Sequence, residues 1–176
     1  MDLSELALIR LSDSYPIKPF DCGDNDLNEF LLGDSKNYYS QLLAVTYLLE
    51  FAEETAAFFS LLNDKISIED ADSKRKWRKI FRDIMPEGKR FKSYPAVKIG
   101  RLGVGNTFQG DGLGTVILDY VKELFIDNNR TGCKYLTVDA YLRSLRFYEK
   151  NGFEYLTEKD KDSETRLMYF DLTAVA

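Results

Sequence analysis

The chain has 176 residues, of which 44% are hydrophobic and 14% aromatic, and its formal net charge is −5. This length and composition allow one sizeable core and are short for two domains, so we predict a single domain over residues 1–176. The sequence contains no histidine, which excludes Ser-His and Cys-His catalysis and most zinc sites, and no metal is expected.

The sequence also bears on cellular location. It has no run of 18 apolar residues, and its first residues lack the basic start and apolar stretch of a signal peptide. We therefore expect a cytoplasmic protein with no membrane contact. Cys22 and Cys133 are far apart and match no metal-ligand spacing, so two reduced thiols and no disulfide are expected.

The first third of the chain reads as a strand, two short helices and a hairpin. The strand is predicted over residues 6–11, and the helices over 26–32 and 35–43. The hairpin is expected to pair 44–51 with 56–62.

Residues 73–93 carry nine lysines and arginines against two acidic residues, a local charge of +7. Because the whole chain carries −5, the remainder carries −12. Trp77, Ile80 and Phe81 have the spacing of one apolar helix face, which predicts an amphipathic helix docked by that face. The bases are candidates for binding a substrate or a polyanion, and a solvated face without a ligand is the alternative. The candidates are Lys74, Arg75, Arg78 and Lys79.

A glycine-rich turn, residues 109–115, lies between a predicted strand and a predicted helix. The strand covers 96–104, and the helix begins at Leu113 and keeps an apolar face as far as Phe125. Glycine lets a backbone approach an anion closely, and the unpaired amides of a first helical turn attract negative charge. The turn therefore predicts a pyrophosphate site, with a turn that binds nothing as the alternative.

The spacing of the glycines separates the known phosphate motifs. A Walker loop needs Gly-Lys followed by Ser or Thr, but Gly114 is followed directly by Thr115. The Rossmann fingerprint needs G-x-G-x-x-G, which this spacing does not give. The pattern that remains is Q-x-x-G-x-G, starting at Gln109.

A strand, a helix and two further strands are predicted after this helix. They cover 135–139, 142–150, 153–156 and 166–172, and Asn151-Gly152 is the expected stop of the helix. This order, after an N-terminal hairpin, predicts an α/β protein built on a central sheet.

Two motifs resemble the GCN5-related N-acetyltransferase (GNAT) superfamily. The Q-x-x-G-x-G turn is similar to the family loop that grips the pyrophosphate of acetyl-CoA, and the stretch from Phe147 to Phe153 is similar to its F-Y-x-x-x-G-F signature. The resemblance covers about residues 20–156. It implies acetyl-CoA as co-substrate, without a metal. The implied cofactor-binding residues are Leu102, Val104, Gln109, Gly110, Asp111, Gly112, Leu113, Gly114 and Thr115.

The fold that the resemblance implies is the acetyltransferase (GNAT) fold, of α/β (α+β) class. It has a mixed, mostly antiparallel sheet of about six or seven strands flanked by helices, splayed between the fourth and fifth strands to admit the cofactor. Two positions depart from the family pattern. Asp111 stands where many members have Arg or Lys, so its carboxylate must point away from a pyrophosphate. Tyr141 stands where members often have an asparagine that helps to hold the cofactor or substrate.

The implied function is N-acetyl transfer from acetyl-CoA to a primary amine by direct attack. In the family the tyrosine that matches Tyr148 protonates the departing thiolate, so Tyr148 is the expected general acid, and a packed aromatic is the alternative. Asp139 is a candidate general base and equally a helix N-cap or turn residue. At pH 7 an α-amine of pKa ~8 is neutral about 10% of the time, against about 0.04% for a lysine at ~10.4, so an α-amine acceptor is favoured slightly.

The segment Phe20-Asp21-Cys22-Gly23, followed by Asp26 to Leu31, is similar to the opening of acetyltransferases that act as toxins of toxin–antitoxin pairs. Those toxins acetylate charged tRNA. A helix start capped by Asp24 or Asp26 is the plain alternative. The acceptor is thus a small molecule, a peptide or an aminoacyl-tRNA, and an antitoxin and nucleic acid bound through 73–93 are implied partners.

Three further alternatives stay open. The basic segment could contact the 3′-phosphate of CoA instead of a nucleic acid, and the protein could form a homodimer. The third alternative is a non-enzymatic function, in which the protein binds acyl-CoA or a partner without catalysis.

Overall fold

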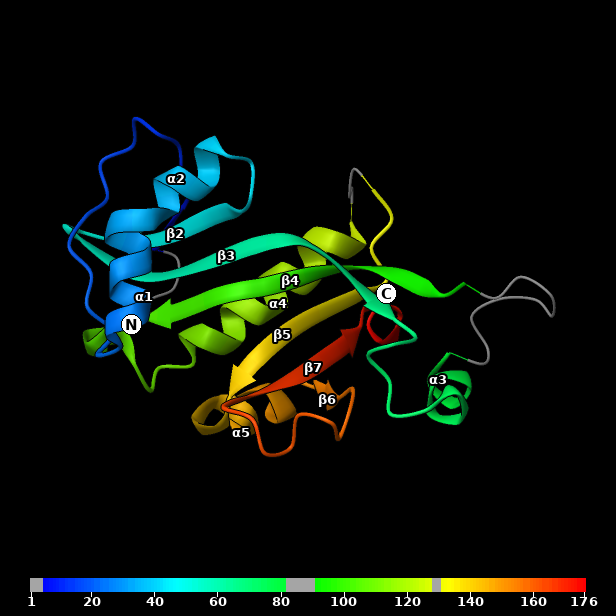
Figure 1. Ribbon diagram of the computed structural model, residues 1–176. Helices are drawn as coiled ribbons and strands as arrows, with labels where there is room; N and C mark the ends of the chain where they lie inside the picture. The colour runs from blue at the N-terminus through cyan, green and yellow to red at the C-terminus, as the bar shows by residue number, and fades with distance from the viewer. Residues whose placement is uncertain (1–4, 82–90, 128–130) are drawn as a thin grey trace. The chain divides into compact units, whose positions relative to one another are not determined.

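The structure, a computed structural model, describes residues 5–81, 91–127 and 131–176. In these residues seven strands form one mixed sheet (Figure 1). The strands are β1 (Ala7–Arg10), β2 (Val45–Phe51), β3 (Glu54–Ser67), β4 (Ser93–Val104), β5 (Tyr135–Tyr141), β6 (Glu154–Tyr155) and β7 (Thr165–Asp171). Their order is β1-β2-β3-β4-β5-β7-β6. The β4–β5 pair is parallel, and the β1–β2, β2–β3, β5–β7 and β6–β7 pairs are antiparallel, which confirms the predicted sheet.

Helices in the described chain follow the predicted order, with different boundaries. They are α1 (Asn25–Glu29), α2 (Ser35–Ser40), α3 (Lys74–Ile80), α4 (Leu113–Ile126) and α5 (Leu145–Lys150). A π-helical turn, Phe30–Asp34, joins α1 to α2, so the two helices expected here form one helical run. This run ends earlier than predicted because Leu42 takes a left-handed φ of 57°. The helix predicted over 142–150 begins as a 3₁₀ turn, Leu142–Ser144.

The chain forms two compact units, each built from two stretches of sequence. The first contains Met1–Leu62 and Ile99–Val121, and the second contains Asn63–Lys98 and Lys122–Ala176. The chain passes from one unit to the other within β3, within β4 and within α4. The single domain over residues 1–176 stays a prediction.

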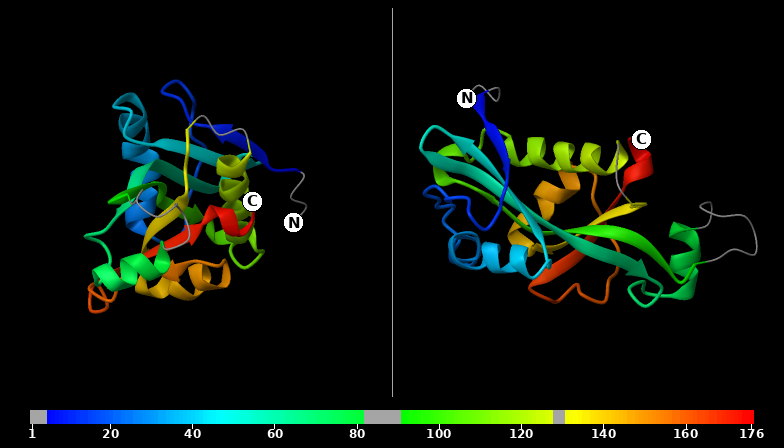
Figure 2. Two further views of the ribbon diagram at one scale, coloured as in Figure 1. Left: turned by 90° about the vertical axis from the view of Figure 1, so that its right-hand side faces the viewer. Right: turned by 90° about the horizontal axis from the view of Figure 1, so that it is seen from above.

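Two faces of the strands in the first unit are covered by different helices (Figure 2). Phe58 and Phe59 of β3 are both fully buried, and successive strand residues point to opposite faces. Phe58 stacks on Phe30 at the end of α1, with ring centroids 6.1 Å apart, and Phe59 meets Tyr120 of α4 edge-on at 6.1 Å. The helical run that starts with α1 therefore packs on one face, and the first part of α4 packs on the other.

An aromatic cluster forms the core of the second unit. Trp77 and Phe81 are each 6% exposed, and their ring centroids are 4.1 Å apart. Phe81 stacks on Tyr94 of β4 at 5.0 Å and meets Tyr135 of β5 edge-on at 5.5 Å. This packing confirms that the basic helix docks by its apolar face. Residues 82–90 of the predicted basic segment lie outside the described residues.

Among the described residues, no helix has the length and apolar character needed to cross a membrane. Cys22 and Cys133 are both free thiols, each partly buried.

Candidate functional site

The predicted phosphate turn lies between β4 and α4, within the first unit. Gly110 and Gly112 have φ angles of 90° and 82°, a left-handed conformation that costs glycine little. A Cβ atom added at either position would meet no atom within 4 Å, so the space beside the backbone is open. The glycines therefore set the path of the turn and leave its backbone accessible.

Consecutive amides in this turn are free to donate. Thr115 and Val116 donate their N–H groups to the carbonyl of Gly112, at 2.9 and 3.2 Å. Within the described parts of the chain, the N–H groups of residues 110–114 have no hydrogen-bond acceptor. The helix that starts at Leu113 is 14 residues long, so the positive end of its dipole adds to these donors. The donor set fits a pyrophosphate.

The other predicted cofactor residues lie along the same path, from the end of β4 into α4. Leu102 and Val104 are partly buried on β4, and Leu113 is buried at 1% exposure. Asp111 is exposed. Thr115 is also exposed, and because its amide is already bonded, only its hydroxyl is available to a ligand.

Gln109 has a different environment. Its side-chain nitrogen lies 3.0 Å from the carbonyl oxygen of Cys22 and 2.9 Å from that of Val104. The same nitrogen lies 3.3 Å from the side-chain oxygen of Asn106. The side chain therefore bonds to its own protein on three sides.

Tyr148 lies in α5, within the second unit, and is 6% exposed. Its ring meets Phe147 and Phe153 edge-on, with centroids 5.0 and 5.3 Å away. Burial raises the pKa of the Tyr148 phenol, so the hydroxyl stays protonated at neutral pH. A general acid needs this protonated form.

The loop after α5 is held by a left-handed glycine. Gly152 has a φ of 85°, and the Phe153 amide donates to the Tyr148 carbonyl at 3.0 Å. This confirms the predicted helix stop, because glycine reverses the chain directly after the helix.

Asp139 lies inside β5, which continues to Tyr141, so its predicted place at a strand end was wrong. The reading of Asp139 as a helix N-cap was also wrong, because Tyr141 precedes the next 3₁₀ turn. Its carboxylate lies 2.8 Å from Lys98 Nζ, and the same ammonium lies 3.7 Å from Asp64. Burial alone would lower the Lys98 pKa, but the hydrogen bond and charge of Asp139, with the charge of Asp64, raise it.

Parallel pairing of β4 with β5 runs from Ala96↔Tyr135 to Lys98↔Thr137. Pairing thus reaches the last residue of β4 that belongs to the second unit, since the first unit resumes at Ile99. The splay of these strands around a cofactor stays a prediction.

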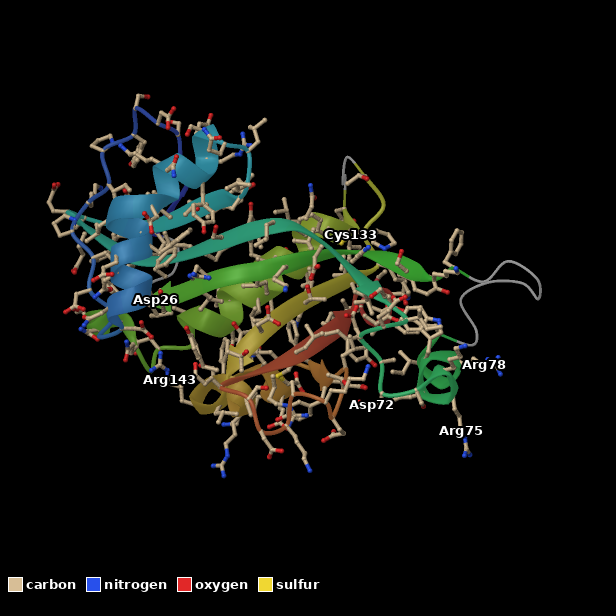
Figure 3. All side chains as sticks on the ribbon, viewed as in Figure 1. Asp26, Asp72, Arg75, Arg78, Cys133 and Arg143 are labelled. Atoms are coloured by element: carbon tan, nitrogen blue, oxygen red, sulfur yellow. The ribbon has the colours of Figure 1, made fainter. Side chains whose placement is uncertain are left out.

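The predicted basic face is exposed on α3. Lys74, Arg75 and Arg78 are exposed, and Figure 3 shows Arg75 and Arg78 projecting outward from the helix. Of Lys79, the structure describes only the backbone. Lys76 is held differently, because its ammonium lies 2.8 Å from the Asp72 carboxylate. The face therefore offers three long cationic side chains to solvent.

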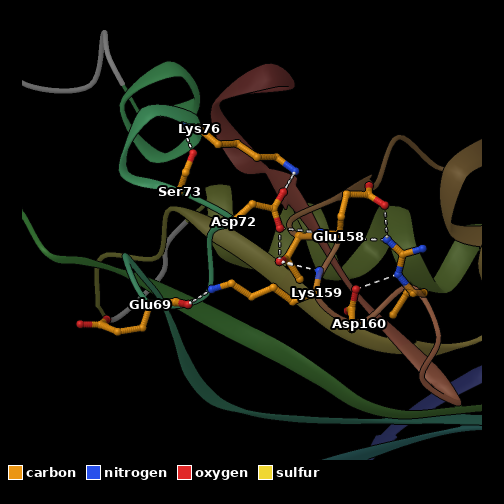
Figure 4. A network of polar contacts seen from close by, with 9 residues as sticks. Glu69, Asp72, Ser73, Lys76, Glu158, Lys159 and Asp160 are labelled. Carbon is orange, nitrogen blue, oxygen red and sulfur yellow. Dashed lines mark hydrogen bonds and ion pairs between the residues drawn. The ribbon is translucent and has the colours of Figure 1, made fainter.

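Asp72 is a residue that the sequence analysis did not single out. In the second unit it accepts hydrogen bonds from Lys76, from the Thr157 hydroxyl at 2.5 Å and from the Glu158 amide at 2.7 Å (Figure 4). Ser73 beside it caps α3 by accepting from the Lys76 amide at 3.1 Å. The sequence shows that Asp72 and Ser73 are residue types that cap the start of a helix. It does not show the hydrogen-bond partners of Asp72 that lie 85 and 86 residues away.

Arg101 was also missed. Its guanidinium lies 5.2 Å from the ring centroid of Phe30, and its Nε lies 3.6 Å from the Asp26 carboxylate. Arg101 could have been found from the sequence, because a charged residue is unusual in a strand that is predicted to be buried on both faces.

Residues 81–155 match the family model described as acetyltransferase (GNAT) domain. No curated protein matched the chain.

Several solved structures share the fold over nearly the whole chain. A tyrosine-to-phenylalanine mutant of KacT superposes with a TM-score of 0.78, AtaT complexed with acetyl-methionyl-tRNAfMet with 0.77, and AtaTR bound with AcCoA with 0.76. Each is 22% identical, and each alignment covers 97% of this chain and 96% of the other. The family match spans the phosphate turn and the Tyr148 motif, and the fold agrees along the chain. Residues 81–155 therefore match the acetyltransferase (GNAT) domain, a class of enzyme that takes its acetyl group from acetyl-CoA, and the chain has the GNAT fold.

Proposed function

We propose that this enzyme acetylates the α-amine of an aminoacyl-tRNA and acts as the toxin of a toxin–antitoxin pair. The observation that carries the proposal is the exposed basic face of α3 in an otherwise acidic chain. Cationic side chains on one helix are what a phosphate backbone binds. The fold of AtaT, solved with acetyl-methionyl-tRNAfMet, supports the same acceptor.

The phosphate turn is the proposed anchor of acetyl-CoA. Amides of residues 110–114 would donate to the pyrophosphate, with the dipole of α4 behind them. Acetyl-CoA supplies a thioester that a neutral amine attacks. The backbone of β4 between Arg101 and Val104 would polarise the thioester carbonyl.

Tyr148 is the proposed proton donor to the departing sulfur. Its buried hydroxyl is protonated at neutral pH. A thiolate formed in an equally dry place would be made more basic by the same desolvation, so the two groups would become better matched for proton transfer.

The acceptor amine must lose a proton, and Asp139 is the candidate base. Its carboxylate is already bonded to the Lys98 ammonium at 2.8 Å, so an incoming amine would have to replace that contact. Because Asp139 is engaged in this way, the favoured acceptor is the amine that depends least on a general base. An α-amine of pKa ~8 has about 200 times the neutral fraction of a lysine at ~10.4 at pH 7.

An antitoxin is a further proposed partner. Solved relatives of the same fold include AtaT bound to the C-terminus of the antitoxin AtaR. A protein of this kind is expected to stop growth when expressed alone.

The test compares acceptors with the purified protein. Radioactive acetyl-CoA is offered with charged tRNA, uncharged tRNA, a peptide with a free N-terminus and a peptide whose only amine is lysine. We expect label on charged tRNA and none on uncharged tRNA. Label on a peptide but not on charged tRNA would show that the proposed acceptor is wrong.

Tyr148→Phe separates catalysis from binding in the same assay. It should reduce turnover about 10²–10⁴-fold while acetyl-CoA still binds in calorimetry, and it should relieve growth arrest. Tyr155→Phe, in a partly buried tyrosine of the same unit, is the matched control and should remain active. Retention of full turnover by Tyr148→Phe would remove its proposed role.

A further inference from the structure

The entrance to the phosphate turn is bonded to a segment far away in sequence. The amide of Asn106 donates to the carbonyl of Asp21 at 2.9 Å, and Gln109 Nε2 bonds to the carbonyl of Cys22 across 87 positions of chain. All four residues belong to the first unit. The N-terminal motif Phe20 to Gly23 and the turn are therefore one structural assembly.

The side chain of Gln109 has no donor to spare. A primary amide carries two N–H bonds, and the Gln109 nitrogen already lies within 3.0 Å of the Cys22 and Val104 carbonyls. A third acceptor, the side-chain oxygen of Asn106, lies at 3.3 Å. The group thus ties the end of β4, the turn and the N-terminal motif together, and it has no N–H left for a phosphate.

The N-terminal side of this assembly is closed by Asp21 and Asn28. Asp21 Oδ1 accepts from the Gly23 amide and from Asn28 Nδ2, both at 2.8 Å. Asn28 Oδ1 in turn accepts from the Cys22 amide at 3.0 Å. These bonds from Gly23 and Asn28 lower the pKa of Asp21, so the carboxylate stays charged.

The network fixes where the free amides of the turn stand. The hydrogen bonds run from Asn28 in α1, through Asp21 and Cys22, to Gln109, which directly precedes Gly110. Gly110 and Gly112 have no side chain that could anchor the turn by packing, and the space beside them is open. The position of the turn must therefore come from its bonded flanks, which are Gln109 on one side and α4 on the other.

We propose that Asp21, Asn28 and Gln109 are positioning residues that set the affinity of the phosphate turn for the pyrophosphate of acetyl-CoA without touching it. The proposal rests on the proposed function, in which acetyl-CoA binds at this turn. It also gives the N-terminal motif a role in holding the cofactor site.

The test removes the hydrogen bonds without adding charge. Gln109→Met and Asn28→Leu keep the approximate side-chain size and lose the polar group. Asn25→Leu on α1 and Gln41→Met after α2 change the same residue types at exposed positions and serve as matched controls. Asp21→Leu removes the oxygen that accepts the bonds from Gly23 and Asn28, so it should weaken acetyl-CoA binding in the same way.

Two ligands are titrated into each variant: acetyl-CoA, and acetyl-pantetheine, which lacks the pyrophosphate. We expect Gln109→Met and Asn28→Leu to weaken acetyl-CoA about tenfold and to leave the affinity for acetyl-pantetheine unchanged. A purely structural defect would weaken both ligands and lower the melting temperature, and this outcome would overturn the proposal. Native affinity for acetyl-CoA in both variants would overturn it as well. Failure of the native chain to bind acetyl-CoA would instead reject the proposed function, on which the network's role depends.

Discussion

Burial acts on Tyr148 in two ways. It keeps the phenol protonated at any physiological pH, because the charged phenolate is the form that a dry environment disfavours. It also makes the phenol a weaker acid, so its usefulness depends on an equally desolvated thiolate as the acceptor of the proton. A tyrosine at the surface, of pKa ~10, would also be protonated at neutral pH, but it would not be matched to a desolvated thiolate.

Gly152 is the residue at which a single methyl group should cost most in this region. Its φ is 85°, and a Cβ atom would lie 2.9 Å from Phe170 Cε2. We expect Gly152→Ala to lower the free energy of unfolding by about 1–3 kcal/mol, because backbone strain and a clash with a buried ring combine. Urea denaturation measures the change.

Gly33→Ala provides the control for this substitution. A Cβ atom at Gly33 meets nothing within 4 Å and the position has no left-handed φ, so alanine should be neutral or slightly stabilising. Equal losses for both variants would mean that the geometry at Gly152 is not the cause.

At the scale of elements, the start of α3 depends on one carboxylate. Hydrogen bonds from Lys76, Thr157 and the Glu158 amide hold the pKa of Asp72 below its ordinary value. A carboxyl whose folded pKa lies below its unfolded value of ~3.9 stabilises the fold above that pH, and the contribution is lost as pH falls below it. Asp72→Asn should therefore be less stable than the native chain at pH 7.

The gap between Asp72→Asn and the native chain should narrow as pH falls below about 4. Thermal melts of both proteins between pH 7 and pH 3 measure it. A gap that stays constant down to pH 3 would show that the protonation state of Asp72 does not matter. Because Asp72 is exposed, added salt should also reduce the gap.

The proposed tRNA acceptor predicts that the outer face of α3 determines how binding responds to salt. Each phosphate contact contributes about 0.7–0.9 to the slope of log K against log salt. Replacing Lys74, Arg75 and Arg78 by alanine should reduce that slope by about 2–3. Fluorescence anisotropy of labelled tRNA across a salt series provides the measurement. A control variant with Lys150→Ala and Lys161→Ala, both exposed, should keep the native slope.

Sequence patterns predicted the elements better than the contacts between them. The phosphate turn and α4 were readable because glycine spacing and helical periodicity are local signals. The bond from Gln109 to the Cys22 carbonyl spans 87 positions, and no local pattern encodes it. The bond between Asp139 and Lys98 on the neighbouring strand, 41 positions away, could not be predicted for the same reason.

At the scale of the whole molecule, the path of the chain argues for cooperative unfolding. β3, β4 and α4 each contribute residues to both compact units. Unfolding one unit would therefore cut short two strands and a helix of the other. We expect a single urea transition, with circular dichroism and tyrosine absorbance giving the same midpoint. Two separate midpoints would show that the units are independent domains.

Charge at this scale is unevenly distributed. The chain carries −5 overall, yet residues 73–93 carry +7 and the remainder −12. A polyanion therefore meets repulsion from most of the molecule and attraction from one segment, and this contrast favours one orientation of approach.

The packing of α3 also gives the protein an optical probe of its own. Trp77 is the chain's one tryptophan, and its ring lies 5.7 Å from Tyr94 in the core beneath the basic face. Its emission therefore arises from this helix alone, with no background from another indole. Lifting α3 from the core would expose the indole to water and shift its emission to the red, whereas a ligand held only by the outer cations would leave the wavelength unchanged. The protein can thus report, without any label, whether occupation of the basic face disturbs the helix that carries it.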